Sequence, residues 1–125
     1  MNNYKVEIIE VSRELTGKER VKLKDLTRAV KLDTVVTVDT PLVISVDAYA
    51  VLKVHNDKAD TGEYIVYVLI DKGGTKYTTG SASLWDSFTN IWDEMQDSGE
   101  EYELEIYKME SSNYKGKHFI TCTIA

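Results

Sequence analysis

Two segments near the end of the chain decide the predicted fold: Tyr102-Glu-Leu-Glu-Ile-Tyr-Lys-Met109 and Lys117-His-Phe-Ile-Thr-Cys-Thr-Ile124. Both alternate between apolar and polar residues, as β-strands do, and the polar loop Glu110–Gly116 separates them. The pattern predicts a β-hairpin. Antiparallel pairing across this loop places Met109 opposite Lys117 and Tyr107 opposite Phe119.

The alternation also predicts which side chains face the core. Leu104, Ile106, Ile120, Cys122 and Ile124 are expected to point inward. Tyr107 and Phe119 then point outward beside lysines, and the loop adds another aromatic residue; this group comprises Lys108, Tyr114, Lys115 and Lys117. Aromatic rings flanked by cations are typical of surfaces that stack on unpaired bases. Glu103 and Glu105 share the outer face, so a nucleic-acid path is expected to favour the loop end.

The length of 125 residues, with 42% hydrophobic and 29% charged content, predicts one globular domain spanning residues 1–125. The net charge of −6 is unevenly distributed. Thr16–Leu32 holds six bases and two acids, a charge of +4, which leaves −10 elsewhere; Asp86–Glu105 holds eight acids and no base. An acidic protein is a poor general coat for duplex DNA, although a local basic groove is compatible with this composition. The alternative is that both runs are simply solvated faces.

The absence of targeting segments and the cysteine content of the sequence indicate the compartment and the redox state of the protein. The N-terminal residues lack the apolar core of a signal peptide, and no apolar run reaches the length of a membrane span, so a cytoplasmic location and no membrane partner are expected. Cys122 is the single cysteine. Its inward position predicts a small core residue rather than a nucleophile.

The remaining elements can be placed by periodicity. Thr16 and Glu19 have the spacing of a capping box and predict the start of a helix within Thr16–Leu32, although alternation there would also fit a strand. Ser83–Met95 carries a broad apolar stripe and predicts the main helix, with Ser81 and Ser83 as caps and Gly99 as its end. Strands are predicted at Tyr4–Val11, Val35–Val38, Leu42–Val46, Ala48–His55, Tyr64–Ile70 and Thr75–Thr79.

This order of elements is mainly β. It predicts a five-stranded OB-like Greek-key barrel with one helix between the third and fourth strands, a fold that commonly binds oligonucleotides. An α+β sheet with a packed helix is the alternative. Along Ala48–His55, Tyr49, Lys53 and His55 alternate outward, which gives the hairpin a second aromatic and basic strand as a companion.

Catalytic chemistry has little support in the sequence. There are two histidines and one cysteine, too few ligands for a common zinc site, and no phosphate-cradling or nucleophile-elbow motif occurs. His118 is expected to be a partly buried residue at a strand end. We therefore expect a protein that is not an enzyme and that uses no catalytic residue, metal or cofactor.

Three segments resemble the small single-stranded DNA-binding proteins of phages and prophages of Gram-positive bacteria. They are Tyr49-Ala-Val-Leu-Lys-Val-His-Asn56, Lys76-Tyr-Thr-Thr-Gly-Ser-Ala-Ser-Leu-Trp85 and the region Ile106–Ile124. The resemblance implies an OB-like fold and the protection of single strands during phage DNA replication or recombination. The chain ends in Thr-Ile-Ala rather than in an acidic partner-binding tail, so the acidic region 93–105 is the candidate docking site for a replication or recombination protein.

The leading functional hypothesis is binding of single-stranded DNA without strong sequence preference. Aromatic residues would stack on bases, and lysines would follow the phosphates, with His55 at the edge. The stacking residues are Tyr49, Tyr107, Tyr114 and Phe119, and the phosphate contacts are Lys53, Lys76, Lys108, Lys115 and Lys117. Two alternatives remain open: an acidic interaction module that modulates a host enzyme, and a homo-oligomeric structural protein whose aromatic face is its interface.

Overall fold

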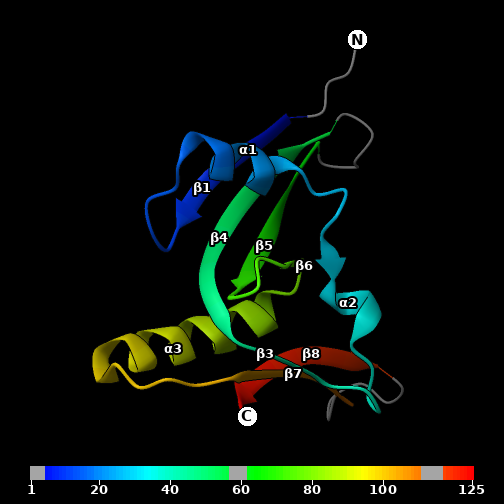
Figure 1. The fold of residues 1–125 in the computed structure, drawn as a ribbon. Helices are drawn as coiled ribbons and strands as arrows, with labels where there is room; N and C mark the ends of the chain where they lie inside the picture. The colour runs from blue at the N-terminus through cyan, green and yellow to red at the C-terminus, as the bar shows by residue number, and fades with distance from the viewer. Residues whose placement is uncertain (1–4, 57–61, 111–116) are drawn as a thin grey trace. The chain divides into compact units, whose positions relative to one another are not determined.

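The computed structural model describes residues 5–56, 62–110 and 117–125 (Figure 1). The chain divides into two compact units, each made of two separate segments. The first unit comprises Met1–Val30 and Asp47–Gly80, and the second comprises Lys31–Val46 and Ser81–Ala125. The single domain expected from the sequence stays a prediction.

The first unit is built on a five-stranded sheet with the strand order β1-β4-β5-β6-β2. Strand β1 pairs antiparallel with β4, and β5 pairs antiparallel with β6. The turn between β5 and β6 is closed by Asp71, whose side chain accepts hydrogen bonds from the Gly73 and Thr75 amides, both at 2.9 Å. The elements are β1 (Lys5–Val11), α1 (Gly17–Lys24), β2 (Val30–Lys31), β4 (Val46–His55), β5 (Glu63–Asp71) and β6 (Lys76–Thr79).

One hydrophobic cluster of this unit packs on the face of the sheet that meets α1, and Leu69 is fully buried on the other face. Ala50, Leu52 and Val54 alternate inward along β4, as predicted, and pack with Val68 and with Leu23 of α1. The predicted capping box begins this helix. The Glu19 amide donates to Thr16 Oγ1 at 3.2 Å, and the Thr16 amide donates to Glu19 Oε1 at 3.0 Å. Leu23 is the one buried residue of α1, so the helix exposes nearly all of its charged side chains.

The second unit combines a three-stranded sheet, ordered β3-β7-β8, with one long helix. The sheet is antiparallel, with Ile106 of β7 opposite Leu42 of β3 on one side and Cys122 of β8 on the other. Helix α3 packs along β8, where Ser83 Oγ donates to the Ile120 carbonyl at 3.2 Å. The elements are α2 (Leu32–Val35), β3 (Leu42–Ile44), α3 (Ala82–Ser98), β7 (Leu104–Glu110) and β8 (His118–Ile124).

Helix α3 has the boundaries that its sequence signals indicate. Ser81 is the N-cap and accepts from the Leu84 amide at 3.2 Å, while Gly99 ends the helix in the left-handed conformation at φ 71°. Leu84, Trp85 and Phe88 are buried. The apolar stripe is therefore a core face, as predicted, because its first half lies fully inside the unit.

The mainly β class with one main helix is confirmed, whereas closure into an OB-like barrel remains a prediction. The strand predicted at Val35–Val38 is wrong. That region contains the short helix α2, and Leu32 and Val36 are both fully buried. Residues four apart share one side of a helix, so the helical turn buries both. Pro41 does mark a strand start, since β3 begins at Leu42.

Candidate nucleic-acid interface

The outer face of the first unit's sheet is the face opposite the cluster that meets α1, and it carries the predicted group on β4. Tyr49, Lys53 and His55 alternate with the buried residues Ala48, Ala50, Leu52 and Val54, and each of the three is half-buried. The prediction that they share one face is thus confirmed. The amide of Ser12, just after β1, donates to the Tyr49 carbonyl at 3.0 Å and so connects β4 to the end of β1.

The same face holds two further tyrosines, which are not among the predicted site residues. Val66, Val68 and Ile70 of β5 pack toward the core, so Tyr67 alternates to the outer face. Tyr77 of β6 lies opposite Leu69 on that side. Leu69 is fully buried, so this part of the face is covered, and Tyr67 and Tyr77 are half-buried. Three neighbouring strands therefore each place a tyrosine on one sheet face. The sequence pattern that could have identified Tyr67 is the two-residue alternation of β5. This alternation is hard to recognise because the strand is apolar on both sides.

Lys53 and His55 do not form a simple cationic strip. Lys53 Nζ lies 3.4 Å from Glu63 Oε2, and Lys53 stands opposite Glu7 in the β1–β4 pair. His55 stands opposite Lys5. The ammonium of Lys53 is consequently balanced by carboxylates, which reduces the charge it offers to a phosphate.

Lys76 has a structural role that differs from the predicted phosphate contact. It lies opposite Ile70, on the core side of the sheet, and its ammonium donates to the main-chain carbonyls of Lys22 and Asp25. Both carbonyls lie at the C-terminal end of α1, where the Asp25 amide also donates to the Lys22 carbonyl at 3.2 Å. Removal from water lowers the pKa of Lys76 below its usual 10.5. The assignment of Lys76 to a DNA-facing surface is corrected accordingly.

The C-terminal hairpin forms in the second unit, but with a different register. Met109 lies opposite Phe119, and Tyr107 lies opposite Thr121, so the strands are shifted by two residues from the predicted pairing. A two-residue shift keeps every side chain on its predicted face, because side chains alternate with a period of two. Tyr107 and Phe119 still share the outer face, with Tyr107 half-buried and Phe119 exposed.

The inward face of the hairpin agrees with the prediction except at its ends. Leu104, Ile106, Ile120 and Cys122 are buried, whereas Ile124 is 45% exposed, so its predicted core position is wrong. His118 is exposed opposite Glu110 rather than partly buried. Both residues lie at strand ends, where fewer neighbours cover a side chain.

Lys108 does not lie beside Tyr107 on the outer face. It stands opposite Ile120 on the inward side of the hairpin, and its ammonium donates to the Asp33 carbonyl at 2.7 Å. The lysine therefore ties β7 to α2 within the second unit. Lys117 is exposed next to β8. The predicted contacts Tyr114 and Lys115 lie outside the described residues.

A strongly basic surface covers α1 and the residues that follow it. The cations are exposed, whereas the acids of this segment make hydrogen bonds with neighbouring groups; the exposed cations are Lys18, Arg20, Lys22, Lys24 and Arg28. Glu19 accepts from the Thr16 amide and from Arg13, and these bonds lower the pKa of its carboxyl. The hydroxyl and amide of Thr27 likewise lower the pKa of Asp25.

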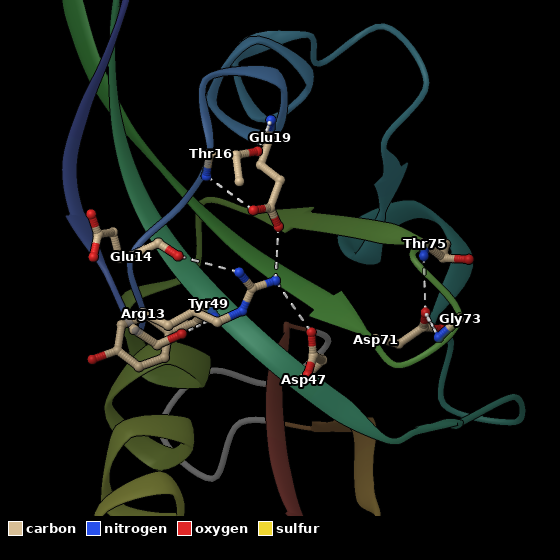
Figure 2. Close-up of polar contacts among 10 residues, drawn as sticks. Arg13, Glu14, Thr16, Glu19, Asp47, Tyr49, Asp71, Gly73 and Thr75 are labelled. Carbon is tan, nitrogen blue, oxygen red and sulfur yellow. Dashed lines mark hydrogen bonds and ion pairs between the residues drawn. The ribbon is translucent and has the colours of Figure 1, made fainter.

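Arg13 joins three segments of the first unit (Figure 2). Its Nη2 atom lies 3.0 Å from Glu19 Oε2 and 3.5 Å from Asp47 Oδ2, and its Nη1 atom donates to the Glu14 carbonyl at 3.4 Å. The hydrogen bond to Glu19, followed by its charge, raises the pKa of Arg13. These contacts hold the guanidinium beside a pocket that Arg13 helps to line.

The second unit buries the thiol of Cys122 and the phenol of Tyr102. Burial raises the pKa of Cys122 to about 12, so the thiol stays protonated at neutral pH. The Tyr102 hydroxyl is buried without a hydrogen-bond partner among the described residues, and desolvation raises its pKa. Cys122 is therefore the core residue that the sequence predicts.

Comparisons with family models, with curated proteins and with solved structures found no match to this chain. Within the described ranges, no helix combines the length and the apolar character needed to cross a bilayer.

Proposed function

We propose that this protein binds single-stranded DNA without strong sequence preference, using the outer faces of its sheets as stacking platforms. The observation that carries the proposal is the placement of Tyr49, Tyr67 and Tyr77 on the same face of three neighbouring strands. Bases of any sequence stack on aromatic rings, and each stacked base contributes about 1–3 kcal/mol.

The hairpin of the second unit supports the same function. Phe119 is 38% exposed and Met109 is 45% exposed, and they face each other on the side that also carries Tyr107. Lys117 supplies a cation beside them. An apolar and aromatic face that meets water is costly unless it serves an interaction, and unstacked bases provide such a partner.

The proposal includes the finer expectations from the sequence. The protein would be an OB-like single-stranded DNA-binding protein of the phage type, acting in replication or recombination in the cytoplasm of a bacterial host. The acids of region 93–105 are consistent with docking of a partner protein, since all of those on α3 and in the following turn, up to Glu103, are exposed. Binding is expected to weaken with added salt, because phosphate contacts release counterions.

The test is a titration of the full chain with short dT oligonucleotides at low salt, followed by intrinsic fluorescence. A Tyr49→Leu/Tyr67→Leu variant removes two rings but keeps apolar volume, and we expect at least tenfold weaker binding. Tyr64→Leu is the matched control, because Tyr64 is an exposed tyrosine of β5 that alternates to the other side of the sheet.

Two further variants locate the contribution of the hairpin. Tyr107→Leu/Phe119→Leu is expected to weaken binding, whereas Ile124→Ala, at an exposed residue on the other face of β8, is expected to leave it unchanged. The circular dichroism spectrum of each variant checks that it remains folded. Absence of dT binding by the natural chain at low salt would overturn the proposal, as would equal losses for Tyr64→Leu and the Tyr49/Tyr67 variant.

A further inference from the structure

The first unit contains a pocket of about 310 Å³ between α1, the start of β4 and the turn that joins β5 to β6. Its apolar wall consists of Leu15, Leu23 and Ile70. Ligand pockets commonly measure about 300–1,000 Å³ and combine an apolar wall with a few polar groups. This one is at the small end of that range, so it suits a ligand the size of a single nucleoside.

Seven charged side chains line the pocket, and most of them already have partners within the first unit. The cations are Arg13, Lys22, Lys72 and Lys76, and the carboxylates are Glu19, Asp47 and Asp71. Arg13 lies between Glu19 and Asp47, as Figure 2 shows. Asp71 accepts hydrogen bonds from its own turn and from the Tyr77 hydroxyl at 3.3 Å.

Two cations of the pocket remain available to a ligand. The ammonium of Lys76 is held by carbonyls of α1, whereas Lys22 and Lys72 are exposed and their ammonium groups form no ion pair with any described residue. They approach the pocket from different elements, α1 and the β5–β6 turn. A phosphate monoester carries a charge of about −1.5 to −2 at neutral pH, which two lysines balance.

We propose that this pocket binds a nucleoside monophosphate, with the phosphate between Lys22 and Lys72 and the nucleoside against the apolar wall. The same chemistry occurs in a free mononucleotide and in the phosphorylated end of a DNA strand. The second source rests on the proposed single-stranded DNA binding, whereas the first does not. Glu19, Asp47 and Asp71 line the same pocket, so a triphosphate, with more negative charge, is disfavoured.

The direct test is a titration of the isotope-labelled chain with dTMP, thymidine and dTTP, followed by amide NMR shifts. We expect dTMP to shift the amides of Leu23 and Gly74, which line the pocket. Thymidine is expected to bind at least tenfold more weakly, and dTTP no more tightly than dTMP. Shifts confined to residues outside the pocket, or tighter binding of dTTP, would overturn the inference.

Matched charge variants separate the pocket from the general field of α1. Lys22→Glu/Lys72→Glu changes both proposed phosphate ligands, and Lys18→Glu/Lys24→Glu makes the same change in charge at two exposed positions of α1 that do not line the pocket. Only the first pair is expected to lower dTMP affinity at least tenfold. Equal losses for both variants would show a diffuse electrostatic effect and would overturn the pocket.

The two sources are distinguished with dT oligonucleotides that carry or lack a 5′ phosphate. Tighter binding of the phosphorylated strand, lost in Lys22→Glu/Lys72→Glu, would assign the pocket to strand ends; dTMP binding alone would assign it to free mononucleotides. Oligonucleotide binding without any dTMP or 5′-phosphate effect would overturn the pocket and leave the proposed function intact. Binding of dTMP without any oligonucleotide binding would support the pocket and overturn the proposed function.

Discussion

The side-chain ammonium of Lys76 in β6 donates to the main-chain carbonyl of Lys22 near the end of α1, and this bond attaches the helix to the sheet of the first unit. A lysine at this position adds a donor to carbonyls at the end of the helix and places positive charge at the negative end of the helix dipole. Lys76 therefore stabilises the fold from within a surface that the sequence would assign to ligand binding.

Replacing Lys76 with methionine keeps most of the aliphatic stem and removes the ammonium. We expect Lys76→Met to destabilise the protein by about 1–2 kcal/mol, the range for losing a hydrogen bond from a charged group that is partly exposed. Urea unfolding followed by circular dichroism measures the change. Lys72→Met, at an exposed turn position, is the control and is expected to stay within about 0.5 kcal/mol of the natural chain.

Two glycines provide a test of backbone conformation in which the expected effects have opposite signs. Gly99 ends α3 at φ 71°, whereas Gly17 is the first residue of α1 and has no positive φ. A β-carbon at either position meets no atom within 4 Å, so packing does not contribute. We expect Gly99→Ala to cost about 1 kcal/mol and Gly17→Ala to stabilise by about 0.4–1 kcal/mol. Thermal unfolding of both variants checks this, and equal shifts would contradict it.

The network around Glu19 predicts a dependence of stability on pH. Hydrogen bonds from the Thr16 amide and from Arg13 lower the pKa of Glu19 below its ordinary 4.5 in the folded state. A depressed carboxyl pKa stabilises the fold above the unfolded value, and this contribution is lost as the pH falls through the folded pKa. We expect stability to decline below pH 4.5 and the decline to be smaller in Glu19→Gln, which retains a side-chain carbonyl for the capping box.

Urea midpoints measured across the acidic range provide the comparison. Glu14→Gln is the matched control, because Glu14 is an exposed neighbour whose carboxylate makes no hydrogen bond with any described residue. This variant is expected to follow the natural chain. An identical acid decline in Glu19→Gln and the natural chain would contradict the role assigned to the network.

Cys122 predicts a chemical response that reports unfolding of the second unit. The thiol is buried, and its pKa is raised to about 12, so almost no thiolate exists at pH 8. We expect iodoacetamide to modify the folded protein at least a hundredfold more slowly than the protein in urea. Rapid modification without urea would mean that the contact between α3 and β8 opens frequently.

The sequence predicts the elements of this fold well where one face of the element is buried. The alternation of Ala50, Leu52 and Val54 sets the faces of β4, and the apolar stripe sets α3, because burial imposes a period of two or of 3.6 residues. Helix α2 was not predicted by this periodicity. The β-branched residues around Val36 favour a strand, but the burial of Leu32 and Val36 selects a helical turn instead.

The sequence predicts on which side of its strand most candidate site residues lie, but not which groups their side chains contact. Alternation places Tyr49, Tyr107 and Phe119 outward, but no local signal defines the hairpin register, which differs from the predicted one by two residues. The contacts of the lysines were the hardest to predict from the sequence. Lys76 and Lys108 donate to main-chain carbonyls of Lys22 and Asp33, residues 54 and 75 positions away, and no spacing rule connects such distant groups.

The pairing of β3 with β7 has a consequence for the order of events during synthesis. Leu42 lies opposite Ile106, so the ribosome adds 64 residues, from 42 to 106, before this pair can form. At about 5–20 residues per second the delay is roughly 3–13 seconds. Every residue of the first unit has been made by Gly80. The nascent chain can therefore complete one unit while the strand Leu42–Ile44 still waits for its partner.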